Sequence, residues 1–172
     1  SEVIDNDDKS KIIDITIEEK ATGEIMAGAG VGTDGTSFSF AVKENNYLGR
    51  GIGLTSELTV SEETIKGQLR VKNPNYKNSD KSVNFNVQSL ETDKLTDSGY
   101  KTNKTGFGFG TSFEYQDDVI IGIGQDSFYE KIETNSSAST RQKAQAGNYW
   151  DTFLNVDLDY DKRNQKYKTS DG

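Results

Sequence analysis

The 172-residue chain contains no cysteine and no histidine. Without cysteine there is no disulfide framework and no thiolate metal site. Without histidine the chain lacks the side chain that most often acts as acid or base near neutral pH. There is a single proline, and the formal net charge of −8 argues against a basic surface for nucleic acid. These absences disfavour most metal-dependent and hydrolytic enzymes, and they disfavour nucleic-acid binding.

Large hydrophobic residues are also scarce. Leu, Ile, Val and Phe make up 37 of the 172 residues, about 22%, close to the roughly 20% below which chains tend to be disordered. The 8 tyrosines, 8 phenylalanines and 1 tryptophan argue for a folded chain, because disordered chains have few aromatics. No apolar run approaches the roughly 18 residues of a membrane helix. The positions of the apolar residues, rather than their number, must therefore indicate the fold.

Apolar and polar residues alternate with a period of two, which predicts strands with one apolar and one polar face. The pattern covers nine segments, at 13–17, 25–31, 38–42, 52–60, 65–71, 83–87, 107–113, 119–123 and 154–160. Eight of them follow Thr22 at a spacing of about 19 residues, which suits membrane-barrel strands better than the 8–12 residues of a small sandwich. Residues 136–146 are expected to form a polar loop. The predicted fold is all-β, an antiparallel up-and-down transmembrane β-barrel.

Two faces and two rims follow from this fold. Long connections at 90–103 and 126–149 would share one rim and short turns the other, as in outer-membrane barrels. The predicted lipid-facing residues are Phe38, Phe40, Val42, Val83, Phe85, Val87, Phe107, Phe109, Val119, Ile121, Ile123, Leu154, Val156 and Leu158. Asn84, Asn86, Asp157 and Asp159 would line a wet interior. The predicted interface aromatics are Tyr47, Tyr76, Tyr115 and Tyr167 at one rim, with Tyr149 and Trp150 at the other.

Three motifs with possible chemistry have simpler structural explanations. The glycine-rich segment 28–35 contains a GxGxxG match, made by Gly30, Gly32 and Gly35, but another alternating segment follows it, whereas a dinucleotide site needs a helix there. Asp157, Asp159 and Asp161 resemble the start of a calcium loop, but Lys162 stands where that loop needs glycine. The carboxylate pairs at 62–63 and 117–118 fall in expected turns and favour a solvated rim. No metal or cofactor is expected.

Four segments in order resemble one family. Residues 11–23 look like the last strand of a periplasmic POTRA domain leading into a barrel, and 28–35 with 44–51 resemble a first hairpin and its periplasmic turn. Residues 71–76 resemble the next periplasmic turn, and 160–172 resemble the close of an eighth strand. Together they resemble the BamA family of outer-membrane protein assembly factors, of the bacterial surface antigens. By this resemblance, residues 1–22 would end a POTRA domain and linker, and 23–172 would form about half of the family barrel.

The resemblance implies a non-enzymatic role in the bacterial outer membrane, folding and inserting other β-barrels. Implied partners are outer-membrane lipids, nascent barrel clients and the lipoproteins of an assembly complex. The first barrel strand would form one side of a lateral seam where client strands pair. Its residues here are Glu24, Ile25, Ala27, Gly28, Ala29, Gly30, Val31 and Gly32. Eight strands are half of the family's number, so the sheet either closes on itself, is completed by a second chain, or belongs to a fragment.

Two other classes of function stay open from the sequence. A soluble secreted β-sandwich, acting as a binding module or adhesin, would bury the same apolar residues between two sheets. An enzyme would need its scattered carboxylates to converge in one cleft.

Overall fold

A computed structural model describes residues 2–5, 11–18, 20–32 and 35–163. Two short strands, β1 (Glu2–Asp5) and β2 (Lys11–Asp14), pair antiparallel with each other. A second, larger sheet follows. Its strands are β3 (Gly23–Gly32), β4 (Gly35–Tyr47), β5 (Ile52–Ser61), β6 (Thr64–Asn73), β7 (Ser82–Lys94), β8 (Tyr100–Gln116), β9 (Val119–Thr134) and β10 (Gly147–Tyr160).

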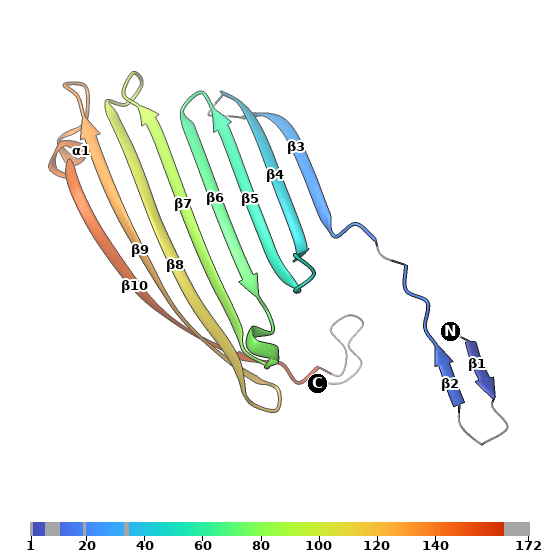
Figure 1. Ribbon diagram of the computed structural model, residues 1–172. Helices are drawn as coiled ribbons and strands as arrows, with labels where there is room; N and C mark the ends of the chain where they lie inside the picture. Colours follow the sequence, from blue (N-terminus) through green and yellow to red (C-terminus); the bar gives the residue numbers. More distant parts are fainter. Residues whose placement is uncertain (1, 6–10, 19, 33–34, 164–172) are drawn as a thin grey trace.

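The eight strands of the larger sheet form an antiparallel meander in which each strand pairs with its neighbours in sequence. Figure 1 shows a single curved layer with β3 at one edge and β10 at the other. Among the described residues these two edge strands do not pair with each other, so closure of eight strands into a small barrel is wrong for this chain. The up-and-down all-β architecture itself is confirmed.

No second sheet covers the larger one in the part of the chain that the structure describes. Within that part, Ala138 is the one buried hydrophobic residue, while Phe40, Phe85 and Phe109 remain 45–52% exposed. A β-sandwich would bury these phenylalanines in a dry core. The sandwich alternative is therefore wrong.

The eight alternating segments after Thr22 all lie within strands, but several boundaries differ from the prediction. The ladder between β7 and β8 runs through Lys94 and Tyr100, so the long loop expected at 90–103 shrinks to residues 95–99. Likewise β9 continues to Thr134 inside the loop expected at 126–149. The strand predicted at 13–17 is also too long at its C-terminal end, because β2 ends at Asp14 and residues 15–17 lie outside any strand.

The connections define two rims. The N-terminal rim, where residues 20–22 enter β3, carries the connections 48–51, 74–81 and 117–118. The distal rim carries 62–63, 95–99 and 135–146. The expectation of only short turns on the N-terminal rim is partly wrong, because 74–81 contains a 3₁₀ turn, η1 (Tyr76–Asn78), and exceeds 95–99 in length.

A short helix, α1 (Thr140–Ala144), lies in the segment expected to be a polar loop. A capping box explains it: Gln142 N donates to Ser139 Oγ at 3.3 Å, and Ser139 N donates to Gln142 Oε1 at 2.9 Å. Across the described ranges, no helix has both the length and the apolar character needed to cross a membrane.

Candidate functional site

One face of the larger sheet carries all of the residues predicted to face lipid. Residues directly opposite each other in neighbouring strands share a face, so the register can be followed across the sheet. One such row contains Val71, Phe85, Phe109, Gln125 and Leu154. We call this surface the apolar face. Many of its large side chains are exposed, from 37% at Val87 to 86% at Val31, and others, such as Val83 and Ile121, are half-buried, so together they form an open apolar surface.

The apolar residues form a band that crosses the strands obliquely. The row of Ile25 reaches Thr152 in β10. In β3 the apolar residues extend from this row to Val31, toward the distal rim, whereas in β10 they extend the opposite way, from Leu154 to Tyr160. The band centre thus shifts by about eight residues, roughly 27 Å, over seven strand spacings of about 4.8 Å each. For the band to run perpendicular to a barrel axis, the strands must tilt by about 40° from that axis. This is the strand tilt of transmembrane barrels.

Aromatic side chains lie at both ends of this band. Tyr129 and Trp150 are direct partners at its distal side, with ring centroids 6.4 Å apart. At the N-terminal rim Tyr47 ends β4, Tyr76 begins η1, and Tyr115 lies in the bulge near the end of β8. The rim positions of these residues are the predicted ones, and their contact with a lipid interface stays a prediction.

Two other predicted interface aromatics do not fit in the same way. Tyr149 pairs with Glu130, on the face opposite to Trp150, and its hydroxyl donates to the Gln145 carbonyl at 3.0 Å. Its assignment to the lipid interface is wrong, because neighbouring residues of a strand point to opposite faces. Tyr167 lies outside the described residues.

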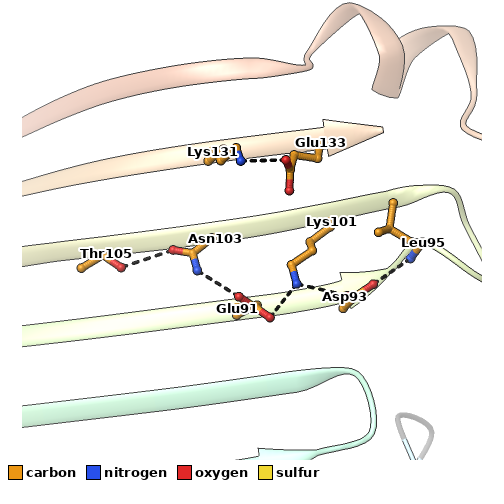
Figure 2. Close-up of polar contacts among 8 residues, drawn as sticks. All are labelled: Glu91, Asp93, Leu95, Lys101, Asn103, Thr105, Lys131 and Glu133. Carbon is orange, nitrogen blue, oxygen red and sulfur yellow. Dashed lines mark hydrogen bonds and ion pairs between the residues drawn. The ribbon is translucent and has the colours of Figure 1, made fainter. Parts of the chain in front are cut away.

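A polar collar continues the apolar face beyond the band toward the distal rim (Figure 2). It consists of Glu91 and Asp93 on β7, Lys101 and Asn103 on β8, and Lys131 and Glu133 on β9. Lys101 Nζ lies 2.7 Å from Glu91 Oε1 and 3.2 Å from Asp93 Oδ2. Asn103 Nδ2 donates to Glu91 Oε2 at 3.1 Å, and Lys131 Nζ lies 2.7 Å from Glu133 Oε1. Because charges are costly on a lipid-exposed barrel surface, the collar marks the end of the apolar band on the side of the distal rim.

The opposite face is mostly polar, although Phe128 and Phe153 lie on it with ring centroids 6.2 Å apart. It presents Asn84, Asn86, Asp157 and Asp159, the residues predicted for a wet interior, around a groove of about 270 Å³. Asn155 Nδ2 donates to Asp126 Oδ2 at 2.7 Å along its wall. Glycines of β8 lie on this face and allow close approach of β7 and β9 side chains. For example, a Cβ at Gly110 would lie 2.6 Å from Asn84 Oδ1. Glycine thus permits the strong curvature seen in Figure 1.

The predicted seam strand is β3, one of the two sheet edges. Within the described part of the chain it pairs with β4 alone, and all of its residues are exposed. Ile25, Ala27, Ala29 and Val31 lie on the apolar face opposite Val42, Phe40, Phe38 and Thr36. On the polar face, Gly28, Gly30 and Gly32 offer no side chain to pack against β4, which weakens the attachment of the strand on that face.

The motifs with possible chemistry gain no support from the geometry. Of the GxGxxG glycines, Gly30 and Gly32 lie in β3 and Gly35 begins β4, so the match is followed by a strand and not by a helix. Within the described ranges no group of three carboxylates is placed to hold a metal ion. What the sequence reasoning missed is the polar collar. Its signal was present as Glu91 and Asp93 two residues apart, facing Lys101 and Asn103 with the same spacing.

Comparisons with known proteins agree with this geometry. The model of the Omp85 superfamily domain matches residues 46–172. A solved structure of BamA from Haemophilus ducreyi lacking POTRA domains 1–3 is similar in fold, with a TM-score of 0.59 and 21% sequence identity. The match covers 90% of this chain and 33% of that one, so the chain spans about a third of its length. Since the family model covers well over half of the sequence, the chain belongs to the Omp85 superfamily.

Proposed function

We propose that this chain is the first part of the barrel of an outer-membrane β-barrel assembly factor. In this proposal residues 1–22 end a POTRA domain and its linker, and residues 23–172 cross the bacterial outer membrane as half of a larger barrel. The single observation that carries the proposal is the oblique apolar band. A band that is level only for strands tilted by about 40°, limited by aromatic residues and a charged collar, fits a sheet in a bilayer.

The proposed activity is strand templating at β3. The free edge of β3 presents unpaired backbone N–H and C=O groups, which another strand can join by β-augmentation. Lipid cannot hydrogen-bond these groups, so an incoming client strand gains more by pairing there than it would in water. The lost side-chain packing at Gly28, Gly30 and Gly32 makes the pairing with β4 weaker and more easily exchanged.

The proposed partners follow from the same surfaces. Outer-membrane lipids would contact the apolar face, nascent β-barrel proteins would pair with β3, and assembly-complex lipoproteins would bind the segments outside the band. Templating needs no covalent chemistry and no cofactor, so the proposed activity is non-enzymatic.

Disulfide capture of a client tests the templating step, because the chain has no cysteine of its own. Ala27→Cys on β3 is compared with Leu69→Cys on β6, an interior strand, on the same face of the sheet. During assembly of a client with cysteines in its terminal strand, we expect disulfide-linked complexes with A27C and few with L69C. Equal capture at the two positions, or none at Ala27, would contradict templating at β3.

A further inference from the structure

Hydrogen bonds with side chains of β4 hold Thr22, the residue that precedes β3, against the end of β4. Thr22 Oγ1 donates to Glu44 Oε1 at 2.5 Å, and the Asn45 backbone N–H and side-chain Nδ2 both donate to the Thr22 carbonyl, at 3.2 and 3.0 Å. Gly23 leaves room for this arrangement, since a Cβ there would lie 2.9 Å from Glu44 Oε2. We call the contacts among Thr22, Glu44 and Asn45 the β3 clamp.

A bulge at the end of β4 frees Asn45 and Asn46 to hydrogen-bond outside the ladder with β5. The register between β4 and β5 shifts between Glu44 and Tyr47, which takes Asn45 and Asn46 out of the ladder with β5. Asn46 then stabilises the turn instead: its backbone N–H donates to Glu44 Oε1 at 2.7 Å, and its Oδ1 accepts from Gly51 N at 2.6 Å. Glu44 Oε1 therefore ties together the turn that follows β4 and the segment that precedes β3.

Farther along the described part of β3 the side-chain support is weaker: Ser37 Oγ donates to the Gly30 carbonyl at 3.5 Å. Toward the distal rim the nearest atom to a Cβ at Gly28 is Ser39 Oγ at 3.0 Å, and Gly32 has nothing within 4 Å. At the distal rim the chain continues directly from β3 into β4, so the two strands are joined covalently there. Separation of β3 from β4 must therefore start at the N-terminal rim, where the clamp lies.

We infer that Glu44 is a positioning residue for the seam strand, acting through Thr22 to keep the N-terminal end of β3 on β4. The inference rests on the proposed function for its biological meaning, but the clamp itself is a property of the fold. Tension in the segment that leads into β3 acts first on Thr22 and reaches the backbone ladder only after the clamp opens. The clamp thus couples the preceding residues to the exchange of β3 between β4 and a client strand.

Hydrogen exchange measured by mass spectrometry tests the clamp without any client. Net hydrogen-bond contributions predict roughly 2- to 10-fold faster exchange in residues 23–32 of Glu44→Ala and Thr22→Val, with residues 64–73 of β6 unchanged. Glu44→Gln should stay near the native rate, because its amide oxygen still accepts both hydrogen bonds. Native exchange in both E44A and T22V, or equally fast exchange in E44Q and E44A, overturns the clamp.

A reversible lock then tests the link to assembly. Glu24 and Lys43 are direct partners one residue beyond Gly23 and Glu44, so Glu24→Cys/Lys43→Cys can join the strands while leaving the clamp residues intact. We expect the oxidised protein to insert fewer client barrels into liposomes than the reduced protein. If clamp variants alter exchange but oxidation leaves insertion unchanged, the proposed coupling is wrong while the templating proposal stands. If neither redox form nor the native protein inserts clients, the proposed function fails independently.

Discussion

Close packing around Gly106 gives a sharp prediction for the curved part of the sheet. Gly106 lies on the polar face of β8, opposite Phe128 of β9. A Cβ at Gly106 would overlap the Phe128 ring and the Ser127 carbonyl oxygen, and even the next nearest atom, Phe128 Cε1, would be 2.9 Å away. The carbonyl belongs to the backbone of β9, so relief requires a shift of the ladder rather than a change of rotamer.

Overpacking of this kind costs about 1–3 kcal/mol. Alanine usually brings a gain of about 0.5–1 kcal/mol over glycine in a strand, so the net loss in the free energy of unfolding of Gly106→Ala should reach up to about 2.5 kcal/mol. Gly67→Ala on β6 is the matched control, because nothing lies within 4 Å of its Cβ position and only the gain should remain. Urea unfolding in lipid vesicles, followed by the fluorescence of the single tryptophan, measures both variants. Equal stabilities for G106A and G67A would refute the packing argument.

Two further predictions concern the apolar face and the distal rim. Leu58→Arg places a charge in the middle of the apolar band and should lower the free energy of unfolding by about 2–4 kcal/mol, as measured by urea unfolding from vesicles. Thr59→Arg, on the polar face, should lower it far less. Equal losses would show that the two faces do not differ in solvent. Ser139→Ala removes the acceptor of the α1 capping box and should destabilise the helix by about 1 kcal/mol, seen as faster hydrogen exchange in residues 139–146 with β6 unaffected. Unchanged exchange in S139A would show that the cap does not hold α1.

Periodicity predicted the larger sheet well because each strand has one apolar face. Segments such as 38–42 and 83–87 alternate strictly, and the strands that contain them pair in the simplest order. The same signal fails where both faces are polar. At Glu91, Asp93, Lys101 and Asn103 the ladder continues through cross-strand ion pairs, so an apolar pattern could not mark the ends of β7 and β8.

The other misses have equally local causes. Ser139 and Gln142 have the spacing of a capping box, a signal for α1 that polarity alone concealed. Tyr149 was assigned by its closeness to a rim, although its parity within β10 differs from that of Leu154 and Val156. The β3 clamp depends on a bulge between Glu44 and Tyr47, and alternation cannot show a one-strand change of register.

The central claim is that one face of the larger sheet contacts lipid and the other contacts water. The most direct test is to measure which solvent surrounds each side chain along one interior strand. Single cysteines at residues 83–88 of β7, in the otherwise cysteine-free chain, are labelled with an environment-sensitive fluorophore after reconstitution into vesicles. We predict quenching by brominated lipid at Val83, Phe85 and Val87, and quenching by aqueous iodide at Asn84, Asn86 and Gln88. Quenching without this period of two, or with the two faces reversed, would contradict the account.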